Sequence, residues 1–225
     1  MQTGDRMNIL YEDASLVLCE KPAGILSEEG GMPELLREAA GAAEIYCVHR
    51  LDRETGGLMV YAKTKRAAAA LSAAIAENRL QKEYWAVVRG EAPAEGTLRD
   101  LLYRDASRNK SYVVDRMRKG VREAELSFRR AAFREGLSLL RVRLKTGRSH
   151  QIRVQFSSRG LPLCGDRKYG SPDRDCPLAL WSAALSFPHP LSGEILSREL
   201  PPPAIRPWTL FADLLFPADA EPGES

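Results

Sequence analysis

The sequence predicts an α+β fold, a mixed and mostly antiparallel sheet flanked by helices and loops. Residues 139–146, LLRVRLKT, alternate apolar and cationic side chains, which is the two-residue period of a strand with one buried face. Several other segments carry strand-like patterns, whereas helical patterns are few. Because strands and helices do not alternate regularly, a parallel βαβ architecture is disfavoured.

The first part of the chain is expected to form two short strands, over residues 8–11 and 16–19, followed by a loop at 21–24. Residues 33–40 predict a short helix, because the proline at its start suits a first turn and Gly41 can end it. This part of the chain is therefore expected to hold both element types.

A longer amphipathic helix is predicted over residues 65–78, where apolar side chains recur at the helical period and Thr64 can cap the N-terminus. The next segment, LQKEYWAVVRG at 80–90, indicates a strand with Tyr84 on one face and Trp85 on the other. A tyrosine in mid-strand is more typical of a core than of a functional site.

Residues 150–159 predict another helix, with Ser149 as its N-cap and Gly160 at its end. A further strand is expected over 181–187, and residues 217–225 are expected to form a polar tail.

Composition is that of a soluble globular protein, with 44% hydrophobic and 28% charged residues in a chain of 225. The sequence has no apolar run long enough to span a membrane and no signal-peptide pattern, so a cytoplasmic location is expected. The four cysteines form no CxxC and are interpreted as scattered buried thiols. The close pair Cys47 and His49 is a weak metal signal, and no metal is predicted.

Charge is distributed unevenly along the chain. Residues 99–168 contain 19 Lys and Arg against 7 Asp and Glu, whereas the remainder contains 14 against 23. This polarisation indicates either a basic face that binds a polyanion or cations on the solvent side of strands, and composition favours neither.

The motifs of several common chemistries are absent from the sequence. It contains no G-x-S-x-G elbow, no P-loop, no G-x-G-x-x-G and no H-E-x-x-H. The chain therefore lacks the sequence signatures of serine hydrolases of the G-x-S-x-G type, P-loop proteins, dinucleotide-binding domains and H-E-x-x-H zinc proteases.

The stretch HRLDRETGG, residues 49–57, places one carboxylate, Asp52, between Arg50 and Arg53. Neighbouring cations favour an ionised carboxylate, which can act as a nucleophile or an electrostatic stabiliser. A conventional glycosidase would need a second carboxylate as its acid, and only Glu54 is near. On the pattern alone, an Arg–Asp ion pair that fixes a turn is the favoured interpretation.

A second candidate site follows the predicted cationic strand. Backbone N–H groups at the start of a helix are combined there with two arginines, a histidine and an amide, which suits a phosphate. The spacing also lets a histidine and an arginine one turn apart face the same cleft. A capped helix with solvated arginines is an equal alternative. The residues concerned are Arg148, Ser149, His150, Gln151 and Arg153.

Taken together, these motifs resemble those of the RluA family of pseudouridine synthases. HRLDRETGGLMVYAKT is similar to the family's HRLD-x-x-T-S-G-L signature, LQKEYWAVVRG to its K-x-Y strand, and LKTGRSHQIRVQFSSRGLPLCGDRKYG to its G-R-T-H-Q-I-R-V-H segment and the following tail. ILYEDASLVLCEKPAGILS and FPHPLSGE match its opening and its late H-P turn. The departures from the family pattern are Gly56, Ser149 and Gln155.

The resemblance implies a single catalytic domain over 1–225, with its core at about 8–211 and no space for an N-terminal S4 domain. It also implies isomerisation of uridine to pseudouridine without cofactor or metal. The implied catalytic residues are Asp52 as nucleophile, Arg153 as its ionic partner and Tyr84 stacked on the uracil. Arg50 is implied to enter the RNA stack, and the implied substrate-binding residues are Arg50, Lys82, Arg148, His150 and Gln151.

The partner implied is structured ribosomal or transfer RNA, bound at a flexible loop, where flipping a base costs only a few kcal/mol. A monomer is the default expectation. Two alternatives are a non-catalytic RNA-binding or ribosome-assembly protein on the same fold, and a hydrolase that uses Asp52 on a nucleoside or sugar. Retention of Asp52, Tyr84 and Arg153 together disfavours the first, and the lack of a clear acid partner disfavours the second.

Overall fold

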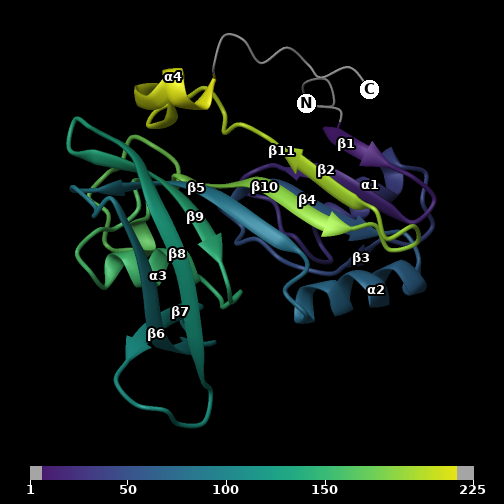
Figure 1. Ribbon diagram of the computed structural model, residues 1–225, viewed down its shortest axis with the longest axis horizontal. Coiled ribbons are helices and arrows are strands. Elements are labelled where there is room, and N and C mark those ends of the chain that lie inside the picture. The colour runs from purple at the N-terminus through teal and green to yellow at the C-terminus, as the bar shows by residue number, and fades with distance from the viewer. Residues whose placement is uncertain (1–6, 217–225) are drawn as a thin grey trace. The chain divides into compact units, whose positions relative to one another are not determined.

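The structure is a computed structural model that describes residues 7–216, shown in Figure 1. The chain divides into two compact units. The first unit comprises Met1–Lys82 and Ser182–Leu200, and the second comprises Glu83–Trp181 and Pro201–Ser225. Helices and antiparallel strands occur in both units, which confirms the predicted α+β class. The predicted polar tail, 217–225, lies outside the described residues, and the single catalytic domain stays a prediction.

The first unit is built on strands in the order β1-β2-β4-β10, to which β10 contributes from Ser182 onward. β3 is paired to β4, and β11 is paired to β10. β2 and β4 are antiparallel, with Leu18 opposite Val60. Every residue of β4 is buried, and Leu58 and Val60 belong to the same core cluster as Leu71. The strands are β1 (Ile9–Glu12), β2 (Leu16–Lys21), β3 (Tyr46–Cys47), β4 (Gly56–Ala62), β10 (Leu180–Pro188) and β11 (Ile195–Glu199).

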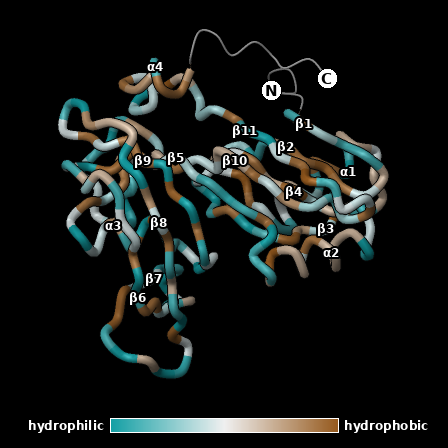
Figure 2. Tube along the Cα trace, viewed as in Figure 1, coloured by the Kyte–Doolittle hydropathy of each residue, from teal (hydrophilic) through white to brown (hydrophobic). Residues whose placement is uncertain are grey.

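Two helices complete the first unit, α1 (Met32–Ala39) and α2 (Lys65–Ala76). The Thr64 hydroxyl accepts the N–H of Ala67 at 3.1 Å, which confirms the predicted N-cap of α2. The buried face of α2, with Leu71, belongs to the core that β2 and β4 supply. Figure 2 shows hydrophobic residues concentrated along these strands.

The second unit is an antiparallel sheet in the order β5-β9-β8-β6-β7, to which β5 contributes from Glu83 onward. α3 (Gln151–Ser157), α4 (Ala212–Leu215) and two 3-10 turns, Arg167–Tyr169 and Trp208–Phe211, accompany it. The strands are β5 (Gln81–Arg89), β6 (Glu95–Asp105), β7 (Lys110–Val114), β8 (Val121–Arg134) and β9 (Leu137–Leu144).

The two faces of this sheet differ as the alternating sequence predicts. On one face Tyr84, Val142 and Phe128 are opposite one another and buried, and the Phe128 ring meets the Phe156 ring of α3 edge-on, with centroids 5.2 Å apart. The other face carries Arg141. Because side chains alternate across a strand, the predicted half-buried strand with one cationic face is confirmed.

The start of α3 differs from the prediction. The helix begins at Gln151 rather than His150, and Ser149 is not its N-cap. His150 holds that position in a left-handed conformation with φ 54°, and its side chain makes no capping bond. The Gln151 amide oxygen instead accepts the N–H of Arg148 at 3.0 Å and the Thr146 hydroxyl at 2.8 Å. The glutamine therefore fixes the turn that the serine was expected to fix.

The remaining predicted elements are confirmed to within a few residues at their ends. Among residues 7–216, no helix is both long and apolar enough to cross a membrane.

Candidate active site

Asp52 lies in the first unit, in the loop that joins β3 to β4. Its carbonyl oxygen accepts the N–H of Thr55 at 3.0 Å, which closes a tight turn. The Ser27 hydroxyl binds Leu51 twice, accepting its N–H at 3.0 Å and donating to its C=O at 2.9 Å. These bonds fix the backbone on both sides of the carboxylate.

Lys21 at the end of β2 is fully buried beneath this loop. Its ammonium donates to three carbonyl oxygens, those of Pro22 at 2.9 Å, Ile25 at 2.7 Å and Arg53 at 3.1 Å. Burial lowers the pKa of Lys21 to about 8, while attraction to Asp52 acts in the opposite direction. Lys21 thus supplies a buried cation and a backbone anchor to the Asp52 loop. The sequence alone does not reveal this role, although Lys21 lies in EKPAG, within one of the segments that carry the resemblance.

The arginines that flank Asp52 have other partners. Arg50 pairs with Glu28 at 2.9 Å, and each of these side chains is more than half exposed. Arg53 donates through Nε to the Gly24 carbonyl at 2.8 Å, which ties the loop to the segment that follows β2. Arg50 therefore lies at the surface, and its insertion into RNA stays a prediction.

Lys82 lies near the residues that lead into the Asp52 loop. Burial lowers the pKa of Lys82 to about 8, with Cys47 acting in the opposite direction. Burial, and then the charge of Lys82, hold the pKa of His49 well below its usual range. Since Nε2 of His49 accepts the N–H of Val60 at 3.1 Å, this imidazole acts as a neutral support for β4.

Tyr84 and Arg153 lie in the second unit. Tyr84 is buried in β5 opposite Val142, on the sheet face that also carries Phe128. Arg153 in α3 is buried and binds the Asp166 carboxylate through two nitrogens, Nε at 2.7 Å and Nη2 at 2.8 Å. Asp166 was not among the predicted residues, although it lies in the quoted GDRKYG. The pairing of Arg153 with Asp52 stays a prediction.

Tyr169 brings two predicted residues together. Its hydroxyl is 2.9 Å from Nδ1 of His150 and accepts the N–H of Ser111 at 2.8 Å. The guanidinium carbon of Arg153 lies 5.3 Å from the centre of the tyrosine ring. His150 and Arg153 therefore share a neighbour, and their facing the same cleft stays a prediction.

Arg148 and Gln151 fasten the turn before α3 to β8. Arg148 donates through Nε to the Glu123 carbonyl at 2.8 Å, and the Gln151 amide nitrogen donates to the Glu125 carbonyl at 3.1 Å. Both side chains thus have structural bonds, and their contact with phosphate stays a prediction.

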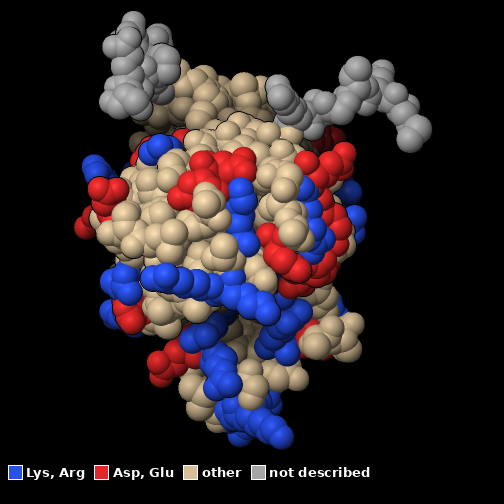
Figure 3. All heavy atoms as spheres, turned by 90° about the vertical axis from the view of Figure 1, so that its right-hand side faces the viewer, with Lys and Arg blue, Asp and Glu red and all other residues tan. Residues whose placement is uncertain are grey.

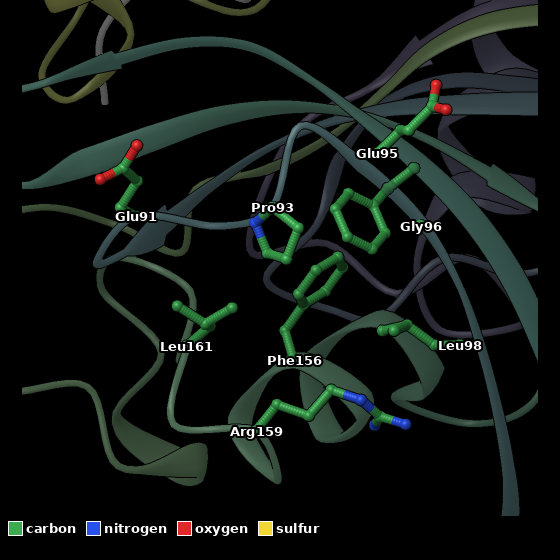
Figure 4. A pocket seen from close by; sticks show the side chains of 9 residues that line it. Glu91, Pro93, Glu95, Gly96, Leu98, Phe156, Arg159 and Leu161 are labelled. Atoms are coloured by element: carbon green, nitrogen blue, oxygen red, sulfur yellow. The ribbon is translucent and has the colours of Figure 1, made fainter.

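A pocket of about 430 Å³ lies elsewhere in the second unit and contains none of the predicted site residues (Figure 4). Its lining includes Phe156 and Leu161, and its charged groups are Glu91, Glu95 and Arg159. Because none of the predicted site residues lines this pocket, it is not the candidate active site.

Cations are gathered at one end of the second unit. Figure 3 shows Lys and Arg side chains over its lower tip, which is the loop between β7 and β8 in Figure 1. Arg116, Arg118 and Lys119 of this loop are exposed. Within the described part of the chain, no cluster of three or more His, Cys, Asp or Glu is arranged to hold a metal ion.

Two solved human structures share this fold. One is human RNA Pseudouridylate Synthase Domain Containing 4, with a TM-score of 0.74 and 24% sequence identity. The other is human RNA Pseudouridylate Synthase Domain Containing 1, with a TM-score of 0.76 and 22% sequence identity. The alignments cover 87% and 91% of this chain, and 88% of each human chain.

Several sequence relatives are more similar. An uncharacterized RNA pseudouridine synthase of Synechocystis, slr1629, is 37% identical over 88% of this chain and 66% of its own length. The ribosomal large subunit pseudouridine synthase D of Neisseria meningitidis is 32% identical over 88% of this chain and 58% of its own. The dual-specificity RNA pseudouridine synthase RluA of Vibrio vulnificus is 36% identical over 86% of this chain and 82% of its own length. The chain thus spans less than two thirds of the first two relatives.

Residues 15–158 match the family model described as RNA pseudouridylate synthase, a span that includes Asp52, Tyr84 and Arg153. The resemblance stated from the motifs is therefore confirmed, and this chain belongs to the RNA pseudouridylate synthase family.

Proposed function

We propose that this protein is an RNA pseudouridine synthase that isomerises uridines in structured ribosomal or transfer RNA, with Asp52 as its nucleophile. The observation that carries the proposal is the Asp52 loop, which lies inside the family match and is held by Ser27 and Lys21 on either side of the carboxylate. A reacting group needs such support, because small displacements of a nucleophile cost much of its rate.

The reaction breaks the bond between N1 of uracil and C1′ of the ribose and forms one between C5 and C1′. C5 loses a proton and N1 gains one, so atoms balance without an added water or redox partner. Asp52 detaches the base in this scheme, and Tyr84 stacks on the uracil and assists proton removal from C5. One carboxylate suffices because the base itself returns to the ribose.

Arg153 is the proposed ionic partner of Asp52. Asp166 binds Nε and Nη2 of this guanidinium and so fixes its plane. A guanidinium held in this way presents its remaining donors in a fixed direction, which favours one orientation of the carboxylate.

The RNA substrate is supported by charge as well as by family. The section from residue 99 to 168 is strongly basic, and its exposed cations at the β7–β8 loop suit phosphate groups. Lys82, Arg148, His150 and Gln151 remain the proposed substrate-binding residues, with Arg50 at the flipped base. We further propose that the protein acts in the cytoplasm as a monomer.

The test is an Asp52→Asn variant, incubated with transcribed ribosomal and transfer RNA and followed by pseudouridine mapping. The expected result is loss of conversion with RNA binding retained, because the amide keeps the shape and removes the nucleophile. The matched control is Glu54→Gln, an exposed carboxylate two residues away, which should stay active. Conversion by Asp52→Asn would refute the assigned nucleophile. RNA binding without conversion by the natural protein would favour the non-catalytic alternative.

A further inference from the structure

Two of the four cysteines, Cys164 and Cys176, meet in the second unit. Their Sγ atoms are 3.1 Å apart, although the residues are separated by 12 positions, and both are free thiols. A disulfide has an S–S distance of about 2.05 Å, so the sulfurs must approach by about 1 Å. Rotation of the two side chains supplies a movement of that size. The expectation of scattered thiols is therefore incomplete, because these two are in contact.

Cys164 is held on a rigid backbone. Its N–H donates to the Val87 carbonyl at 2.8 Å, and its carbonyl accepts the N–H of Ala179 at 2.9 Å. The following residue, Gly165, has φ +75°, and a Cβ there would lie 2.2 Å from the Pro177 carbonyl oxygen. Only glycine permits this close approach, which brings the Cys176 segment against Cys164.

The segment that carries Cys176 is anchored through Ser171, Asp173 and Arg174. Asp173 accepts three hydrogen bonds from Arg89, the shortest at 2.8 Å, and another from the Ser171 hydroxyl at 2.8 Å. Arg167 donates to the Arg174 carbonyl at 2.9 Å. These contacts hold the Cys176 segment beside Cys164, whose thiol also neighbours the Asp173 carboxylate.

The two thiols differ in solvent exposure. Cys164 is buried, with 3% exposure, and burial raises its pKa well above the usual range. Cys176 is only partly buried. The Arg89 guanidinium lies close to both sulfurs, but it is paired with Asp173, whose carboxylate is also close to Cys164. Cys176 is therefore the thiol that an oxidant reaches, and Cys164 is placed to react with it afterwards.

We propose that Cys164 and Cys176 form a reversible intramolecular disulfide in response to a peroxide. The Cys176 thiolate attacks one peroxide oxygen and breaks the O–O bond, which yields a sulfenic acid and releases hydroxide or water. The Cys164 sulfur then attacks the Cys176 sulfur, and the hydroxyl group departs as water with the thiol proton. The peroxide gains two electrons and the two thiols lose them.

The disulfide would close a segment whose side chains bind residues elsewhere in the second unit. Asp166, which binds Arg153, and Tyr169, which binds His150, both lie between the two cysteines. A disulfide that closes this segment restricts the unfolded chain and leaves the contacts of the folded chain in place. Oxidation therefore stabilises the second unit, whatever reaction the protein performs.

The test uses the full chain, treated with hydrogen peroxide under mild conditions, alkylated and digested with trypsin. Cleavage after Arg159, Arg167 and Arg174 places the cysteines on different peptides, 160–167 and 175–198. The expected result is a linked pair of these peptides, lighter by two hydrogens than their sum, which dithiothreitol separates. The melting temperature of the oxidised protein should rise by about 5 °C or more.

Variants make the assignment specific. Cys176→Ser should abolish the linked peptides and the rise in melting temperature, whereas a Cys19→Ser, Cys47→Ser double variant should preserve both. Separate alkylation of Cys164 and Cys176 after peroxide, or a cross-link to another cysteine or a second chain, would overturn the proposal. Irreversible oxidation of Cys176 to a sulfinic acid would do the same. The peptide readout on the natural chain decides the question even if a variant fails to fold.

Discussion

Arg153 and Asp166 form a buried bidentate ion pair, with Nε 2.7 Å from Oδ2 and Nη2 2.8 Å from Oδ1. The side chains are 4% and 0% exposed. Asp166 also caps the 3-10 turn before Gly170, since its carboxylate accepts the N–H of Tyr169 at 3.3 Å. One carboxylate thus orients the arginine and the turn that carries Tyr169.

Loss of that carboxylate should be costly. Asp166→Asn leaves Arg153 as a buried charge without full compensation, which typically lowers the free energy of unfolding by about 3–5 kcal/mol. Urea denaturation measures the change. The control is Glu135→Gln, whose pair with Arg206 is largely exposed and should contribute under about 1 kcal/mol. Equal losses in the two variants would show that the buried pair has no special role.

Lys21→Met should loosen the Asp52 loop. The substitution keeps the length of the side chain but removes the donor to three backbone carbonyls, so the free energy of unfolding should fall by at least about 2 kcal/mol. If the proposed function holds, the rate of pseudouridine formation falls as well. Lys63→Met, which breaks a single, partly exposed ion pair with Glu12, is the matched control and should change both quantities much less. An active, fully stable Lys21→Met protein would contradict the anchoring role.

The lowered pKa of Lys82 predicts a pH-dependent stability. The folded protein releases this proton near pH 8, whereas an unfolded lysine holds it to about pH 10.4. Between these values the unfolded state binds more protons, so stability from this group rises with pH. Below pH 8 the buried charge is a cost that Lys82→Met removes.

The measurement compares Lys82→Met with the natural protein at pH 7 and pH 9.5. The advantage of the variant in unfolding free energy should shrink at the higher pH by up to about 2 kcal/mol. Exposed Lys65 supplies the control. The difference in unfolding free energy between Lys65→Met and the natural protein should not change with pH. If the difference in unfolding free energy between Lys82→Met and the natural protein is the same at both pH values, the pKa of this lysine is not lowered.

The basic loop between β7 and β8 should contribute to RNA binding through phosphate contacts. Replacing Arg116, Arg118 and Lys119 together by alanine should weaken binding and reduce the slope of log affinity against log salt by about 2–3. Filter binding at several salt concentrations gives the slope. A Lys65→Ala, Arg66→Ala variant in α2 removes exposed cations of the first unit and serves as the comparison. An unchanged slope in the loop variant would place the RNA elsewhere.

Short-range rules were sufficient for much of the fold. The Thr64 cap, the alternation in β9 and the apolar face of α2 each depend on residues within a turn or two, so their patterns are visible in the sequence. Asp52 could be singled out for the same reason, because its motif is contiguous. The start of α3 was predicted wrongly, since Gln151 is held by the Glu125 carbonyl on another strand.

The sequence by itself determined the element types, the basic section, the family and the residues in its contiguous motifs. Only the tertiary structure decided which groups support them. Lys21 reaches the Arg53 carbonyl, Asp166 binds Arg153, and the Cys164 and Cys176 thiols meet. These contacts join residues that are 12 to 32 positions apart. No local periodicity encodes such distances, because they are set by how strands and loops pack rather than by the conformation of any one segment.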